Sequence, residues 1–327
     1  MPGQQSLAYA LRRLAQAVPT VLVIAAMNFL VLQLAPGDAA EVLAGEAGSA
    51  TPEFMAQLRK NFGLDQPLGM QLLLYIKQLI TLDLGYSFRH SMPVIELIGS
   101  RLFPTLLLMV TVLLISVGVG TLLGAFAARN LNRWQDNVIS MLTVLAYATP
   151  VFWAGLMLIV VFSIKLGWFP TSGMQEVAAF HEGAAKVRDI AHHLVLPAVT
   201  LTMFYLALYA RLMRASVLEQ FSMDYVVTAR AKGLTEPQIA RRHVLRNAVL
   251  PVLTMAGVQV GGLLGGAVVV ETVFAWPGLG LLAYESLFAR DLNLLLGIFF
   301  ICTCLVVVVN LVVDVAYSLL DPRIELR

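Results

Sequence analysis

The chain has 327 residues, of which 59% are hydrophobic and only 13% are charged. Soluble domains carry about 25% charged residues, so this composition excludes a soluble globular protein and indicates an integral membrane protein. The net charge of +2 leaves no basic domain on which nucleic-acid binding could rest.

Six apolar runs are long enough to cross a bilayer, which requires roughly 20 mostly apolar residues. Backbone polar groups in lipid must bond within their own segment, so we expect each run to be a helix. Pro104, Pro197 and Pro251 stand near the starts of their runs, where a missing N–H costs little. Pro150 stands mid-run and should kink the third span. The predicted spans are Leu14–Leu34, Phe103–Ala128, Val138–Leu166, Leu194–Leu212, Val249–Val273 and Leu294–Leu320.

The first run has the basic flank of a secretory signal peptide, Arg12 and Arg13. Its apolar part is too long for such a signal, and the pair Ala35–Pro36 is a poor cleavage site. We therefore expect an uncleaved membrane span.

The distribution of basic residues predicts the orientation. Thirteen of the 22 Lys and Arg residues lie at the N-terminus, in the turn Arg129–Arg133, in the segment Arg211–Arg246 and in the tail. Because cytoplasmic loops carry the excess of Lys and Arg, we expect both termini and the basic segment in the cytoplasm. The expected divisions are 1–35 (N-terminus and first span), 36–101 (extra-cytoplasmic segment), 102–320 (five-helix core with a cytoplasmic loop at 216–248) and 321–327 (cytoplasmic tail).

The first outer segment is long enough for helices of its own. Thr51 can cap one helix, which Gly63 would end. A second helix, about Pro67–Thr81, is too short to span and should lie at the membrane interface. It serves either as a passive cap on the bundle or as a docking surface for an external partner, and the sequence leaves both interpretations open.

The second outer loop, about Gly167–His193, contains His181, His192 and His193. Histidine is a common metal ligand, but no fourth ligand stands at a recognised spacing, and adjacent histidines cannot easily share one ion. We interpret them as polar residues at the membrane edge. The two cysteines, Cys302 and Cys304, point to different faces of a helix, so we expect neither a disulfide nor a metal site there.

Two spans are predicted to pack closely. Gly120 and Gly124 form a GxxxG motif in the second span, and Gly257, Gly261 and Gly265 repeat the spacing in the fifth. Small residues let helix backbones approach each other. The contact could be within the chain or with a second membrane subunit.

No motif indicates chemistry carried out by this chain. No row of paired carboxylates crosses the spans, as a proton relay would favour, and neither HExxH nor GxSxG occurs. The chain also lacks the GxxxxGK[ST] phosphate loop, so we expect no bound cofactor and no enzymatic activity. Asn28, Trp153 and Gln259 are candidates for lining a translocation path.

The basic connection Ser222–Thr254 has its own local organisation. Asp224–Lys232 contains good helix formers, and Gly233 should end that helix. Thr235 and Gln238 have the spacing of a capping box, which predicts a second short helix over about Glu236–Asn247. The simplest alternative is an inside loop that is basic only because orientation requires it.

A face of this second helix could contact a partner. Ile239 and His243 stand four residues apart with Arg242 alongside, so they should share one face. Arg241, Arg242 and Arg246 carry donors suited to carboxylates.

Two stretches of this connection, DYVVTARAKGL (224–234) and RHVLRNAVLP (242–251), closely resemble the EAA coupling loop of ABC importer permeases. The resemblance is to the dipeptide, oligopeptide and nickel importer family, whose form also lacks the first Glu of the motif. Val227, Thr228, Ala229 and Gly233 occupy the motif positions. The stretches LAPGDAAEVL, LDLGYSF, SRLFPTLLL and VVVETVFAWPGLG extend the similarity over nearly the whole chain.

The resemblance implies an all-α membrane protein with six transmembrane helices in the type I ABC importer permease fold. It implies a multi-pass subunit of the bacterial inner membrane that pairs with a second homologous permease. Two cytoplasmic ATPases would bind ATP with Mg, and a periplasmic or surface binding protein would deliver substrate. Peptides are the expected cargo, with nickel, glutathione, an opine or a sugar left open.

The resemblance also assigns the ATPase-coupling residues, of which we expect Ile239, Arg242 and His243 to make the contact. The rival classes are an ion-coupled secondary carrier that works alone and a non-transporting scaffold subunit. The full coupling set is Asp224, Thr228, Ala229, Arg230, Lys232, Gly233, Leu234, Ile239, Arg241, Arg242, His243 and Arg246.

Overall fold

The computed structural model describes residues 18–31, 33, 51, 56, 60, 65–87, 89–176, 178 and 180–320, the last nine by backbone alone. The chain divides into two compact units. One contains the residues up to Phe103 together with those from Leu281 onward, and the other is Pro104–Gly280. The chain therefore passes between units within α5 (Val94–Arg129) and within α12 (Leu279–Phe288).

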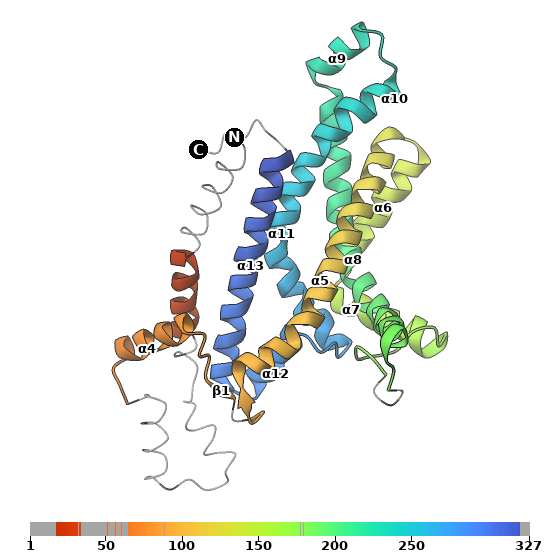
Figure 1. Ribbon diagram of the computed structural model, residues 1–327. Coiled ribbons are helices and arrows are strands. Elements are labelled where there is room, and N and C mark those ends of the chain that lie inside the picture. Colours follow the sequence, from red (N-terminus) through yellow and green to blue (C-terminus); the bar gives the residue numbers. More distant parts are fainter. Residues whose placement is uncertain are drawn as a thin grey trace. The chain divides into compact units, whose positions relative to one another are not determined.

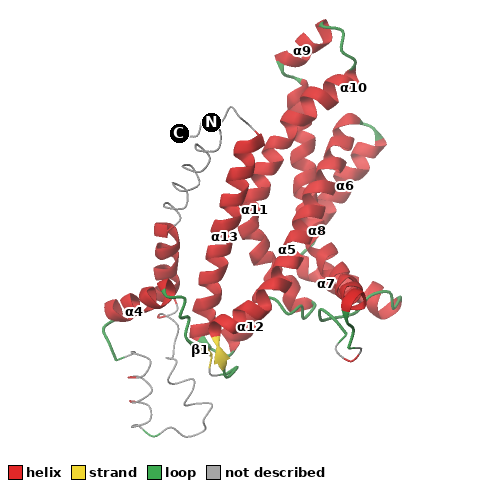
Figure 2. Ribbon diagram, in the orientation of Figure 1, coloured by secondary structure: helices red, strands yellow, loops and turns green. Residues whose placement is uncertain are grey.

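The described residues are mostly helical, as expected (Figure 2). A small departure from the all-α expectation is an antiparallel pair of two-residue strands, β1 (Tyr86–Ser87) and β2 (Met92–Pro93), directly before α5. The predicted helix beginning near Thr51 falls largely outside the described residues, as do the tail and the N-terminal residues before Val18.

Four described helices are long and apolar enough to cross a membrane (Figure 1). They are α5, α8 (Gly183–Phe221), the continuous helical run Glu236–Val273, and Leu292–Leu311 within α13 (Leu292–Leu320). These match the second, fourth, fifth and sixth predicted spans. Of the first predicted span, the structure describes the apolar helix Val18–Val31 and Gln33, so the count of six remains a prediction.

The third predicted span is broken rather than gently kinked. Helix α6 (Trp134–Ala148) is followed by α7 (Val151–Leu158) and the π-helical η1 (Ile159–Lys165), and the two arms are bent by 103°. Pro150 disfavours the helical conformation of the residue before it, and Thr149 is accordingly extended, with ψ of 125°. The predicted site of distortion is confirmed, and the pair forms either a broken span or a re-entrant segment.

The other three prolines lie inside helices, contrary to our expectation that they stand near helix starts. Pro104, Pro197 and Pro251 are interior residues of α5, α8 and α11 (Leu245–Val273). The helices begin before the apolar runs, since polar residues continue them beyond the apolar stretch. For the same reason His192 and His193 belong to α8 and not to a loop.

In the unit Pro104–Gly280, α8 packs against α6, α7 and α11. Gly120 and Gly124 of α5 lie against α8: a Cβ on Gly120 would be 2.9 Å from the Cβ of Tyr209, and one on Gly124 would overlap the carbonyl oxygen of Ala210. The GxxxG motif therefore packs within the chain. On α11, Gly262 and Gly266 approach Tyr205 and Leu201 of α8, whereas Gly261 and Gly265 face open space.

The other unit contains α4 (Leu68–Ile80), which confirms the predicted helix over Pro67–Thr81. The Phe29 ring stacks on Tyr75 at 5.5 Å, and Gln33 donates a hydrogen bond to Gln71 at 3.1 Å, so α4 is attached to the first helix. Separately, the Ser87 hydroxyl donates to the Asp291 carboxylate, which joins β1 to the residues before α13.

Candidate functional site

The connection between α8 and α11 forms a compact cap at one end of its unit. It consists of α9 (Asp224–Ala231), α10 (Glu236–Ile239) and the π-helical η3 (Ala240–Val244). Figure 1 shows α9 and α10 beyond the ends of the two long helices that they connect. We call the residues Ser222–Ala248 the connector.

Helix α9 has one buried and one exposed face. Met223 precedes the helix in an extended conformation, and Asp224 supplies a negative charge to the first turn, where the helix dipole favours it. Val226 and Ala229, three residues apart, are buried. Val227 is 61% exposed despite its apolar side chain, so the outer face of α9 carries an exposed apolar side chain.

A glycine ends α9, as predicted. Gly233 has φ of +80°, a conformation that side chains with a Cβ rarely adopt. The Leu234 N–H donates to the carbonyl of Ala229 at 3.2 Å, and the Gly233 N–H donates to that of Arg230 at 2.9 Å. These two bonds are the Schellman pattern, which satisfies the last carbonyls of the helix.

The next helix is fixed relative to α9 by polar contacts. The Thr235 N–H donates to the side-chain oxygen of Gln238 at 2.9 Å, which forms the expected reach-back bond of a capping box. The Arg230 guanidinium contacts both oxygens of Glu236, at 2.6 and 3.2 Å. This hydrogen bond raises the pKa of Arg230 above its ordinary value.

The π-helical turn changes which residues share a face. In η3 the backbone bonds join residues five apart, as in the Leu245 N–H to Ala240 carbonyl bond. Ile239, Val244 and Ala248 therefore line up, and all three are buried at 0% exposure. The prediction that Ile239 contacts a partner is corrected here, because its side chain anchors the connector within the chain.

The three arginines that follow are turned outward. Arg241, Arg242 and Arg246 are exposed, and in the part of the chain that the structure describes their guanidinium groups have no ion-pair or hydrogen-bond partner. His243 is half-buried, with its ring 6.4 Å from that of Tyr225. The connector carries five Arg and Lys residues against two acidic ones, so its exposed surface is suited to carboxylates.

The remaining predicted coupling residues divide by exposure. Ala229 is buried and Leu234 is half-buried, so they stabilise the connector internally. The exposed residues of the predicted set are Asp224, Thr228, Arg230, Lys232, Gly233, Arg241, Arg242 and Arg246.

The predicted path residues lie on separate elements. Asn28 is half-buried in the helix Val18–Val31, Trp153 is exposed on α7, and Gln259 is half-buried on α11. The Gln259 amide contacts the Met255 sulfur at 3.8 Å on its own helix. Their role in a path stays a prediction.

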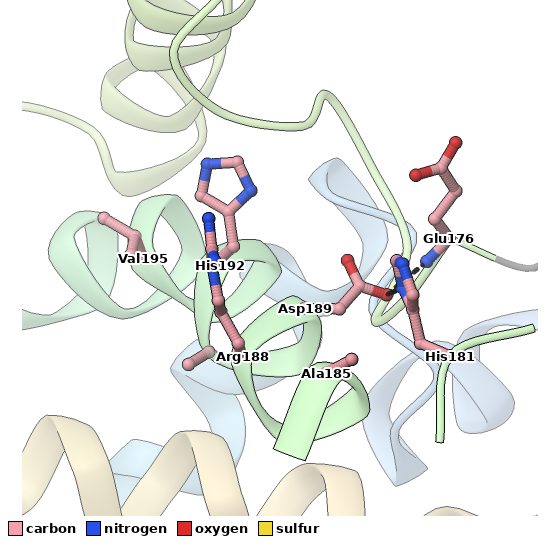
Figure 3. A pocket seen from close by; sticks show the side chains of 8 residues that line it. Glu176, His181, Ala185, Arg188, Asp189, His192 and Val195 are labelled. Carbon is pink, nitrogen blue, oxygen red and sulfur yellow. Dashed lines mark hydrogen bonds and ion pairs between the residues drawn. The ribbon is translucent and has the colours of Figure 1, made fainter. Parts of the chain in front are cut away.

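Two of the predicted histidines, His181 and His193, lie beside the Asp189 carboxylate near the start of α8, and Figure 3 shows His181 and Asp189 with His192 nearby. The Asp189 carboxylate accepts the Glu176 N–H at 2.7 Å and lies 3.1 Å from the His193 ring and 3.6 Å from the His181 ring. A cavity of about 680 Å³ adjoins them. Among the described residues, no group of His, Cys, Asp and Glu could hold a metal ion. The arrangement fastens the preceding loop to α8.

Sequence reasoning missed two buried carboxylates. Asp136 of α6 makes a two-contact ion pair with Arg214 of α8, at 2.7 and 2.8 Å. We used Arg214 only as one of the basic residues that predict the orientation. Glu271 of α11 is fully buried. A carboxylate inside an apolar run is the signal that could have indicated Glu271, whereas Asp136 stands in the polar stretch before the third predicted span.

The chain matches one family over most of its length. Residues 120–326 match the family described as the binding-protein-dependent transport system inner membrane component. Residues 6–110 match the N-terminal region of such membrane components.

Similar proteins and structures agree with that match. The chain is 40% identical over 319 residues to the glutathione transport system permease protein GsiC of Salmonella choleraesuis, covering 98% of this chain and 99% of that protein. It is 38% identical over 315 residues to a peptide transport system permease protein of Brucella abortus, covering 96% and 98%. Its fold is similar to a chain of the MetNI methionine ABC transporter in an inward-facing conformation, with a TM-score of 0.56, 17% identity and coverage of 69% of this chain and 97% of that chain.

Proposed function

The chain belongs to the family of binding-protein-dependent transport system inner membrane components, and from this membership we infer that it forms half of the translocation pathway of an ATP-driven importer. A subunit of this kind works with an ATPase and a substrate-binding protein. We propose one further homologous permease, two ATPases and one binding protein as its complement, in a bacterial inner membrane. The chain itself would form no covalent bond to its cargo.

The proposed substrates are short peptides. The relatives cited above are permease proteins of peptide and glutathione transport systems, and glutathione is itself a tripeptide. Asn28, Trp153 and Gln259 remain our candidates for the path, since amide and indole groups can hydrogen-bond to a peptide backbone.

The connector is our proposed docking surface for the ATPase, and the observation that carries this is helix continuity. The chain is helical without a break from Glu236 to Val273. Arg241 and Arg242 therefore belong to the same continuous helix as the membrane-spanning segment. A displacement of the connector by the ATPase would therefore move α11 as a body. The exposed arginines would pair with carboxylates, and Val227 would supply an apolar contact.

Transport in vesicles tests the proposed function. We expect the complex of permeases, ATPases and binding protein to take up radiolabelled dipeptides and tripeptides only when ATP is enclosed with the ATPases. Uptake by this chain alone, driven by a proton or sodium gradient, would instead establish a secondary carrier. Assembly with ATPases but no flux of any peptide would indicate a scaffold subunit.

Charge reversal tests the docking surface within that assay. Arg241→Glu with Arg242→Glu should abolish peptide uptake and release the ATPase from the complex, because carboxylates would then face carboxylates. Lys186→Glu is the matched control, since Lys186 is an exposed cation at the opposite end of α8. Equal ATPase retention in both variants would contradict the assignment.

A further inference from the structure

Glu271 lies near the end of α11 that is remote from the connector, and its carboxylate is fully buried. One oxygen accepts the hydroxyl hydrogen of Thr105 at 2.8 Å, and the other accepts the Gly280 N–H at 2.7 Å. The Thr105 oxygen in turn accepts the Leu279 N–H at 2.7 Å. The carboxylate thus lies at the N-terminus of α12, where the free N–H groups and the helix dipole stabilise a negative charge.

The surrounding chain is shaped to the carboxylate. A Cβ on Gly278 would overlap the Glu271 carboxylate itself, and one on Gly280 would be 2.6 Å from the Cα of Val268. Trp276, two residues before Gly278, is buried, and its indole N–H donates to the Pro104 carbonyl at 3.0 Å. The end of α11, the following turn and α5 are therefore joined by one buried polar network, which we call the Glu271 joint (Thr105, Glu271, Trp276, Gly278 and Gly280).

The Glu271 joint includes residues next to both ends of the unit Pro104–Gly280. The unit boundaries fall between Phe103 and Pro104 in α5 and between Gly280 and Leu281 in α12. Thr105 and Gly280, which both donate hydrogen bonds to the carboxylate, lie at these two passages. A single side chain on α11 therefore fixes both of them.

We propose that Glu271 is a positioning residue for transport: it fastens α5 and α12 to α11, so that motion of the connector reaches both passages between the units. The inference rests on the proposed coupling function of the connector. The helical run from Glu236 to Val273 carries the displacement, and the charge-assisted bonds of the joint transfer it, since such bonds are stronger than neutral ones. An apolar contact at this place would permit sliding, whereas bonds of fixed direction resist it.

A matched pair at Thr105 tests the joint. Thr105→Val has nearly the same shape but lacks the hydroxyl, and Thr105→Ser keeps the hydroxyl. In the complete complex in vesicles, we measure peptide uptake and ATP hydrolysis stimulated by the binding protein in the same samples. We expect Thr105→Val and Glu271→Gln to retain hydrolysis while uptake per ATP falls about tenfold, and Thr105→Ser to stay near wild type.

The outcomes separate this inference from simpler explanations. If Thr105→Val keeps the wild-type ratio of uptake to hydrolysis, or if Thr105→Ser loses as much as Thr105→Val, the joint does not transmit motion. A parallel loss of uptake, hydrolysis and melting temperature in Thr105→Val would make the joint purely structural and overturn the proposal. Failure of the proposed function would instead show as a wild-type complex without ATP-driven uptake.

Discussion

Arg230 and Glu236 form a two-contact ion pair, at 2.6 and 3.2 Å, across the turn that contains Gly233. Both side chains are about half exposed, so water screens the pair and its contribution to global stability is small. Its geometric effect is larger, because the planar guanidinium and the planar carboxylate must lie in register. The pair therefore sets the angle between α9 and α10.

Exchanging the two charges tests that role. We expect Arg230→Glu and Glu236→Arg to reduce ATP-driven uptake severalfold without a measurable change in melting temperature. The double exchange should recover part of the loss because it restores an ion pair at the same place. Additive losses in the double variant would show that each residue acts separately, for example through direct contact with the ATPase.

The conformation of Gly233 gives a prediction that does not depend on side-chain size. No atom lies within 4 Å of a Cβ placed on Gly233, but its φ is +80°. A β-branched residue should cost at least about 1–2 kcal/mol there, while Asn tolerates this region. We therefore expect Gly233→Val to lose coupled uptake and Gly233→Asn, which is of similar size, to retain most of it. Equal losses would indicate that the surface, and not the turn, requires glycine.

Ile239 and Val227 should separate folding from docking. Ile239 is buried, so Ile239→Ala should leave a cavity and destabilise the chain by about 2–5 kcal/mol. Val227 is exposed, so Val227→Ala should leave the melting temperature unchanged and weaken binding of the ATPase. Thermal unfolding in detergent and a binding titration check the two effects. A wild-type melting temperature for Ile239→Ala would contradict the packing assignment.

The close approach of α5 and α8 predicts a strong effect at one glycine and a weak one at another. Gly124→Leu should prevent stable insertion, because the site is filled by the backbone of Ala210 and by Met213. Gly118→Leu, on the same helix, has no atom within 4 Å of its Cβ and should be tolerated. The yield of monodisperse protein after extraction measures the difference, and a normal yield for Gly124→Leu would disprove the contact.

Local signals in the sequence were sufficient for much of the connector. The helix end at Gly233 and the cap at Thr235 and Gln238 depend on residues that are at most six apart, and both were predicted. The exposed face of the second helix was predicted wrongly. In the π-helical turn Ala240–Val244, residues that share a face are five apart instead of four. No residue type in that turn identifies it.

Long-range features could not be derived in the same way. An apolar run marks the apolar part of a helix and does not mark where the helix begins or ends. Helices α5 and α8 begin before their apolar runs, and Pro104 and Pro197 are therefore interior residues. One partner of Glu271 is Thr105, 166 positions away in the chain. Such a pairing follows from the tertiary contacts of α5 with α11 and α12, and the hydropathy pattern of a sequence does not predict such contacts.

The central claim is that the connector is the surface that contacts the ATPase, and site-specific photo-crosslinking tests it most directly. A benzophenone amino acid is placed at Val227 or at Arg242, and at Arg188 near the start of α8 as the control; all three side chains are exposed. In the assembled complex, we predict that the first two probes crosslink to the ATPase and that the Arg188 probe does not. An intact complex in which neither connector probe reaches the ATPase would contradict the account.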